Sequence, residues 1–130
     1  MTQKDIVSSA LSKIYQYEKL GRKLVELKPV SILLKEILKI MNEEGYVGTF
    51  QEIEDGRGNY LKLNLLGKIN KCGSIKPRFS VKIQDFTKKE QRYLPARGFG
   101  VIILSTPKGI LTHKKAFEQK TGGSLLAYCY

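Results

Sequence analysis

The residues best suited to chemistry form a short polar turn, Ser105-Thr106-Pro107-Lys108-Gly109, directly after the apolar run 101–104. Two hydroxyl groups, a lysine and the backbone donors of a tight turn can contact phosphate, sugar or base edges. The same hydroxyls could instead satisfy neighbouring backbone groups in a purely structural turn. Composition alone does not separate these two interpretations.

Positive charge surrounds this turn along the chain. The 130 residues carry 23 Lys and Arg against 12 Asp and Glu, a formal net charge of +11. Residues 1–65 hold 10 basic and 9 acidic side chains (net +1), whereas residues 66–130 hold 13 and 3 (net +10). This asymmetry favours a surface that faces a polyanion, since net charge governs association rather than fold. A soluble domain that is basic for no functional reason is the plainer alternative.

Several cations of the second half could hold phosphates. Lys114 and Lys115 fall in the first turn of an expected helix, where each opposes the helix dipole at a cost of about 0.3–1 kcal/mol that a bound anion would reverse. Two solvated lysines explain these positions equally well. Other basic residues of this half strengthen the phosphate interpretation. They are Arg78, Lys82, Arg97, Lys108 and Lys120.

Catalysis has little support. A nuclease needs clustered carboxylates for a metal ion, or an acid–base pair that includes histidine or lysine. The second half offers only Asp85, Glu90 and Glu118, at spacings that predict no shared face. His113 is the single histidine, and we expect it at the surface or against RNA, at a helix N-terminus that would lower its pKa. We therefore expect no enzyme activity, no metal, no cofactor and no small-molecule substrate.

The two cysteines, Cys72 and Cys129, lack the spacing and the histidine partners of a zinc site. We expect both to be buried apolar residues in a reducing compartment. The polar N-terminus, interrupted by Asp5, predicts no secretory signal, and runs such as 101–104 are too short to cross a bilayer. These features favour a cytoplasmic protein with no membrane partner.

Hydrophobic periodicity predicts an α/β first half. Helices are expected over residues 5–19 and from Pro29 to Gly45, with Ser31 as N-cap of the second, and a strand over 23–28 between them. Period-two patterns then predict a hairpin, with strands over 46–54 and 60–65. The glycines of its turn match neither the dinucleotide-binding nor the P-loop motif.

The second half is expected to be mainly β with short helices. A turn-rich passage over 67–77 precedes a strand with Phe79, Val81 and Ile83 on its core face and cations on the other. Thr87 fits a capping box for a helix that ends before Pro95. A strand over 101–105, a helix from Thr112 to about residue 120 and a strand over 125–130 follow. The predicted fold class is α+β, with subdomains 1–66 and 67–130.

Several of these passages together resemble one known family, the eighth protein of the small ribosomal subunit (S8), in its archaeal and eukaryotic form. The passages cover essentially the whole chain. The most specific is the segment 100–116, with its glycine, aliphatic pair, Ser-Thr, second glycine and Ala116. The others are the opening helix, the helix from Pro29 to Gly45 with Tyr46 after it, 66–73, 77–79, 94–100, and the Gly-Gly pair before the final apolar strand that ends in Tyr130.

The resemblance implies two small, tightly associated subdomains, the first with element order α-β-α-β-β. It implies a structural constituent of the small subunit with no enzymatic activity, part of a ribonucleoprotein that acts in translation. Its expected partners are the central domain of small-subunit ribosomal RNA, which it would bind early in assembly, and neighbouring ribosomal proteins. A regulatory RNA-binding protein acting on its own messenger RNA is the alternative, and a nucleic-acid-processing enzyme is a weaker one.

The resemblance also implies RNA-binding residues. The Ser-Thr loop of the family contacts bases and minor-groove sugars, which carries over to Ser105, Thr106, Lys108 and Gly109. Further contacts are implied at Thr2, Lys28, Ser31, Gly122, Gly123 and Ser124. The chain departs from the family pattern at three positions. Pro107 replaces a third hydroxyl, and Ile32 and Phe117 stand where basic residues are common.

Overall fold

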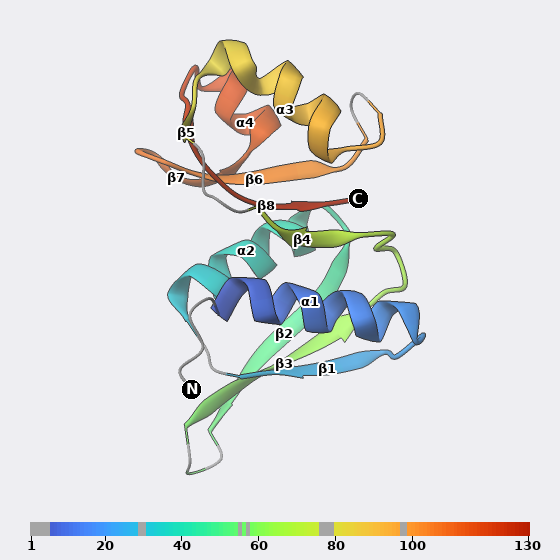
Figure 1. Ribbon diagram of the computed structural model, residues 1–130. Helices are drawn as coiled ribbons and strands as arrows, with labels where there is room; N and C mark the ends of the chain where they lie inside the picture. The colour runs from blue at the N-terminus through green and yellow to red at the C-terminus, as the bar shows by residue number, and fades with distance from the viewer. Residues whose placement is uncertain (1–5, 29–30, 55, 57, 76–79, 97–98) are drawn as a thin grey trace. The chain divides into compact units, whose positions relative to one another are not determined.

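The computed structural model describes residues 6–28, 31–54, 56, 58–75, 80–96 and 99–130. The chain forms two compact units, Met1–Cys72 (the N-terminal unit) and Gly73–Tyr130 (the C-terminal unit). Both contain helices and antiparallel sheet, which confirms the α+β class (Figure 1). The boundary between the units lies after Cys72, whereas the sequence pattern divides the chain after residue 66. The tight association of the subdomains stays a prediction.

The N-terminal unit has the predicted order of elements. These are α1 (Ile6–Lys19), β1 (Leu24–Leu27), α2 (Ile32–Glu43), β2 (Val47–Glu54) and β3 (Asn59–Leu65). The strands form an antiparallel sheet in the order β1-β3-β2. Figure 1 shows α1 and α2 over one face of this sheet.

Periodic apolar residues explain why these elements pack together. The faces of α1 and α2 bury side chains such as Leu11, Ile14 and Leu38 completely, and Leu61 and Leu63 of β3 alternate into the same unit's core. Ser31 is the N-cap of α2, as predicted, because its hydroxyl accepts a hydrogen bond from the Leu34 N–H at 3.0 Å.

The C-terminal unit is built around a five-stranded sheet. Its strands are β4 (Cys72–Ser74), β5 (Ser80–Val81), β6 (Val101–Thr106), β7 (Gly109–Thr112) and β8 (Gly123–Cys129). Strand order is β4-β8-β6-β7, and β5 also pairs with β8. A 3₁₀ turn, η1 (Ile83–Asp85), leads into α3 (Phe86–Tyr93), and α4 (His113–Glu118) follows β7. Figure 1 shows both helices over one face of this sheet.

Three predicted elements of this unit were wrong in detail. The passage 67–77 contains a strand, β4, besides turns. The described part of the strand expected with Phe79, Val81 and Ile83 on its core face is Ser80–Val81, because Ile83 already belongs to the 3₁₀ turn. Phe79 lies outside the described residues. Thr87 is no helix cap, since η1 runs directly into α3 and Asp85 holds the N-cap position without a side-chain hydrogen bond.

The core of the C-terminal unit lies between the sheet and its two helices. Ile102 and Leu104 of β6 and Leu125 of β8 pack there against Phe86 of α3 and Ala116 of α4. Because these strand residues share one face, the next residue on each strand points to the opposite face. That alternation sets the directions of the polar side chains where β6 and β8 end.

Candidate nucleic-acid interface

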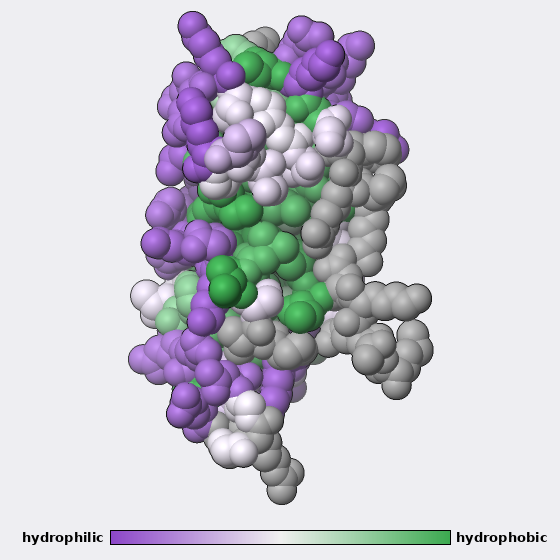
Figure 2. All heavy atoms as spheres, turned by 90° about the vertical axis from the view of Figure 1, so that its left-hand side faces the viewer, coloured by the Kyte–Doolittle hydropathy of each residue, from purple (hydrophilic) through white to green (hydrophobic). Residues whose placement is uncertain are grey.

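The polar turn is the tip of a β-hairpin, residues 105–109. Thr106 pairs with Gly109, so that only Pro107 and Lys108 form the turn and the two hydroxyl residues belong to β6. Pro107, Lys108 and Gly109 are exposed, Ser105 is half-buried and Thr106 is buried. Gly109 has φ +115°, a conformation that L side chains rarely adopt. Figure 2 shows residues of intermediate hydropathy gathered around this end of the sheet, with hydrophilic residues beside them.

The Thr106 hydroxyl stabilises the turn from within. It donates a hydrogen bond to the Gly109 carbonyl at 2.7 Å and accepts one from the Lys108 N–H at 3.1 Å. This is the structural role that the sequence left open beside RNA contact. The tip is therefore held rigid by its own threonine, while Ser105 has no such role among the hydrogen bonds of the turn.

Lys108 connects the tip to the end of α4. Its Nζ donates a hydrogen bond to the Gln119 carbonyl, at 3.2 Å. Gln119 is the C-cap of α4, where a cation is favourable beside the exposed carbonyl groups. The lysine thus stays exposed at the tip while its head group is held in one place.

Three serines lie opposite one another across neighbouring strands. Ser105 of β6 pairs with Ser124 of β8, and Ser124 pairs with Ser80 of β5. Residues directly opposite in antiparallel pairs point to the same face, so these side chains form a serine row (Ser105, Ser124 and Ser80). Adjacent strands lie about 4.8 Å apart, which spreads the row over roughly 10 Å.

Two glycines allow the strands of the serine row to approach closely. A Cβ atom on Gly123 would overlap the Ser105 carbonyl, and one on Gly122 would overlap the Val81 carbonyl. Gly122 and Gly123 are thus required for packing beside the row. Their proposed contact with RNA remains untested.

The other predicted RNA-binding residues divide between the two units. Lys82, Lys114 and Lys115 are exposed on the C-terminal unit, the last two in the first turn of α4. Thr112 caps this helix as predicted, since its hydroxyl accepts from the Lys115 N–H at 3.2 Å. Lys28 is exposed and Ser31 half-buried on the N-terminal unit. Thr2, Arg78 and Arg97 lie outside the described residues.

The charge of the C-terminal unit suits a polyanion. By sequence, residues 73–130 carry 11 Lys and Arg against 3 Asp and Glu, a net charge of +8. Residues 1–72 carry 12 against 9, a net charge of +3. The exposed hairpin tip and the serine row therefore belong to the more cationic unit.

A comparison with known protein families matches residues 5–130 to ribosomal protein S8. The chain belongs to the ribosomal protein S8 family. S8 proteins are structural, RNA-binding components of the small ribosomal subunit, so this chain is a small-subunit ribosomal protein that binds ribosomal RNA. The resemblance drawn from the sequence is confirmed at the level of the family.

His113 of this S8 protein lies inside the C-terminal unit, so its expected place at the surface or against RNA was wrong. It is only 5% exposed, and its Nδ1 accepts a hydrogen bond from the Ile102 N–H at 3.1 Å. Its Nε2 lies 3.7 Å from a Glu90 carboxylate oxygen and has no hydrogen-bond partner. Burial lowers the pKa of His113, and Lys114 lowers it further, although Glu90 opposes both.

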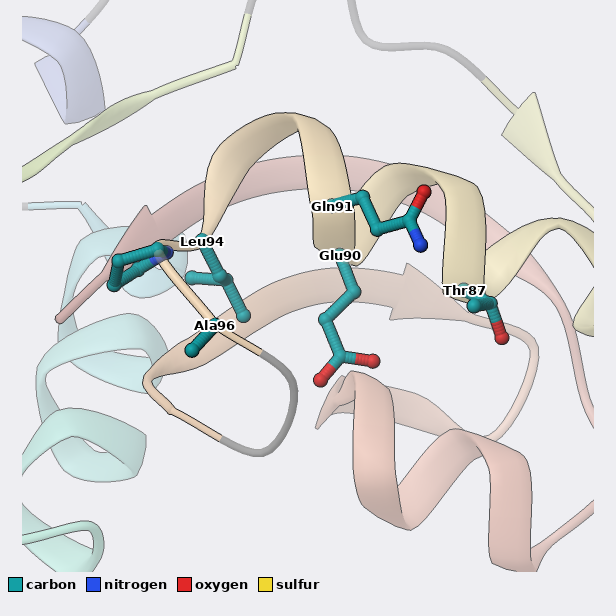
Figure 3. A pocket seen from close by; sticks show the side chains of 6 residues that line it. Thr87, Glu90, Gln91, Leu94 and Ala96 are labelled. Atoms are coloured by element: carbon teal, nitrogen blue, oxygen red, sulfur yellow. The ribbon is translucent and has the colours of Figure 1, made fainter.

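The described part of this S8 protein shows no constellation suited to metal chemistry. None of its groups of His, Cys, Asp and Glu could hold a metal ion with three ligands. Figure 3 shows a pocket beside α3, where Glu90 points away from Gln91 and lies with Thr87, Leu94 and Ala96 around the hollow. Among the described helices, none is long and apolar enough to span a membrane.

Ser80 was not among the predicted RNA-binding residues, and the structure places it in the serine row. The alternation of apolar and polar residues around Val81 had already put Ser80 on the polar face of its strand. Its position opposite Ser124 could not be read in this way. Pairing of β5 with β8 joins residues 44 positions apart in the chain, at Ser80 and Ser124.

Proposed function

We propose that this chain binds the central domain of small-subunit ribosomal RNA early in assembly, with the tip inserted against the RNA. Ser105 and the backbone of the tip would contact base edges or sugars, and cations of the C-terminal unit would hold phosphates. One observation supports this proposal above all. The hairpin turn at Pro107 and Lys108 is exposed, is stabilised by the Thr106 hydroxyl, and belongs to a unit with a net charge of +8.

The proposal includes a non-enzymatic role, a cytoplasmic location and the archaeal or eukaryotic form of the protein. Neighbouring small-subunit proteins are its further partners. Five further residues are proposed to contact the phosphate–sugar backbone of the RNA: Thr2, Lys28, Ser31, Arg78 and Arg97. Membership in the S8 family supports a ribosomal, RNA-binding protein with ribosomal partners, and the finer statements are part of the proposal.

Co-sedimentation with small ribosomal subunits at increasing salt tests the partner and the electrostatics together. We expect the protein to sediment with the subunits at low salt and to be released gradually, since each phosphate contact adds about one unit to the salt slope. Lys114→Ala should weaken binding to a ribosomal transcript and to an unrelated RNA equally, and reduce the slope by about one. Failure to bind the ribosomal transcript at low salt would overturn the proposal.

Two alternatives make different predictions. A regulator of its own messenger RNA would use the same surface, and crosslinking in cells would recover that messenger rather than ribosomal RNA. An enzyme acting on nucleic acid would turn over RNA in the presence or absence of divalent metal. No specific contact in the structure favours either alternative over ribosomal RNA binding.

A further inference from the structure

The serine row ends at a cationic pocket on the edge of the C-terminal unit. This pocket, called the α3 pocket from here on, has different lining residues from the pocket of Figure 3 and a volume of about 370 Å³. It is lined by Ser80, Val81, Asp85, Lys88, Lys89 and Arg92. Ser80 belongs to both features, because it pairs with Ser124 in the row and also lines the pocket. The pocket lies outside the residues for which RNA contact was predicted.

The spacing of the cations follows from the helix. Lys88 and Arg92 are four residues apart on α3, so their side chains lie on one face, and Lys89 is next to that face. Lys88 and Arg92 are exposed, and the guanidinium of Arg92 lies over the Tyr93 ring at 5.6 Å from its centroid. The aromatic contact limits the freedom of Arg92 without covering its donors.

Two of the three acidic residues of the C-terminal unit line a different pocket from this one. Among the residues that line the α3 pocket, Asp85 is the single carboxylate against three cations. The other two acidic residues of the C-terminal unit, Glu90 and Glu118, line a different pocket with His113 and Phe117. The two sides of α3 therefore differ in charge: the α3 pocket combines three cations with one carboxylate, whereas the other pocket combines Lys114 with two carboxylates.

We propose that the α3 pocket holds phosphates of the same RNA that the tip contacts, with the RNA passing the edge of the sheet at Ser80, which is common to the serine row and the pocket. This inference rests on the proposed function and adds a second, helix-borne site to it. Lysine and arginine form charge-assisted hydrogen bonds to phosphate in the pocket, and the Ser80 hydroxyl can donate to a phosphate or sugar oxygen at the edge.

The test compares two double variants that remove the same charge. Lys88→Gln with Arg92→Gln alters the pocket, and Lys35→Gln with Lys39→Gln alters an equally spaced pair on α2 of the N-terminal unit. Binding to a transcript of small-subunit ribosomal RNA is measured from 50 to 300 mM salt, a range chosen to give a slope. Lys88, Arg92 and Lys39 are exposed helix positions, which tolerate glutamine well, whereas Lys35 is half-buried and pairs with Glu52. Circular dichroism and thermal unfolding therefore verify the folding of both variants before their binding is compared.

We expect the pocket variant to bind on the order of tenfold more weakly near 150 mM salt, with a slope reduced by about two. The α2 variant should lose much less. Asp85→Asn should tighten binding severalfold, because it removes the carboxylate of the pocket and no side-chain cap of α3. If the two double variants behave alike and Asp85→Asn changes nothing, the pocket does not hold RNA. If wild-type protein ignores the transcript, the proposed function itself fails.

Discussion

Ser105 and Thr106 are neighbours in β6, but their side chains point to opposite faces and have different roles. Thr106 is buried and bonded to both ends of the turn, whereas Ser105 is half-buried and faces Ser124 across the strand pair. Of the hydroxyl pair noted in the sequence, Thr106 therefore stabilises the turn, whereas RNA contact by Ser105 stays a prediction. Single substitutions should separate the two roles.

Thr106→Ala should lower the free energy of unfolding by about 1–2 kcal/mol, because the Lys108 N–H and the Gly109 carbonyl lose their partner. Thr106→Ser keeps the hydroxyl and should recover most of this loss. Urea denaturation of the three proteins measures the difference. Equal stability of Thr106→Ala and wild type would show that the brace is unimportant.

Ser105→Ala should leave stability nearly unchanged and weaken binding to the ribosomal transcript by roughly 1 kcal/mol. The reason is that Ser105 contributes a hydroxyl to the exposed end of the sheet and none to the turn. Filter binding with an unrelated RNA is the control, and its affinity should not change. An equal loss on both RNAs would contradict recognition by the serine.

The stability of the protein should depend on pH through His113. Because the pKa of His113 is lowered in the folded state, the unfolded chain binds its proton at higher pH than the folded chain. The contribution of neutral His113 to the free energy of unfolding is therefore fully present above pH 6.5, the ordinary pKa of histidine. It is lost progressively as the pH falls below that value. Urea unfolding at pH 7.5 and 5.5 should show lower stability at pH 5.5.

His113→Gln is the control for this pH dependence, since it removes the titrating group and leaves the carboxylates in place. Its stability should change less than that of wild type between the two pH values. A direct check is available as well, because the chain has a single histidine and one imidazole signal in proton NMR. An NMR titration with a midpoint at or above 6.5 would refute the prediction.

Gly123→Ala should destabilise the C-terminal unit by about 1–3 kcal/mol, because the new methyl group would overlap the Ser105 carbonyl and force β6 and β8 apart. The matched control is Gly73→Ala, whose methyl group would meet only the Tyr128 side chain, with 3.2 Å to its hydroxyl oxygen. Thermal unfolding compares the two. A larger loss for Gly73→Ala would show that the β6–β8 approach is not the tighter constraint.

Cys72 should resist alkylation in the folded protein. Burial, with a smaller effect from Glu18, raises the pKa of its thiol to about 12, so very little thiolate exists at pH 8. Iodoacetamide labelling, read separately for the two cysteines by peptide mass spectrometry, should be slow in buffer and fast in urea. Rapid labelling of Cys72 in buffer would mean that its surroundings open readily.

Local patterns predicted much of the fold. The helices α1 and α2, the hairpin of β2 and β3, and the Ser31 and Thr112 caps follow from apolar spacing and from hydroxyls placed before apolar runs. The capping box at Thr87 failed because the preceding 3₁₀ turn had already started the helix. The strand β4 was missed since three residues carry too short a pattern.

The sequence by itself determined the charge asymmetry, the family, most elements and the polar tip, because each depends on residue type or on neighbours along the chain. Only the tertiary structure decided that His113 is buried, that Thr106 braces the turn, and that Ser80 stands opposite Ser124 next to the cations of α3. Those relationships depend on strand register and helix packing between distant residues, which local periodicity does not encode.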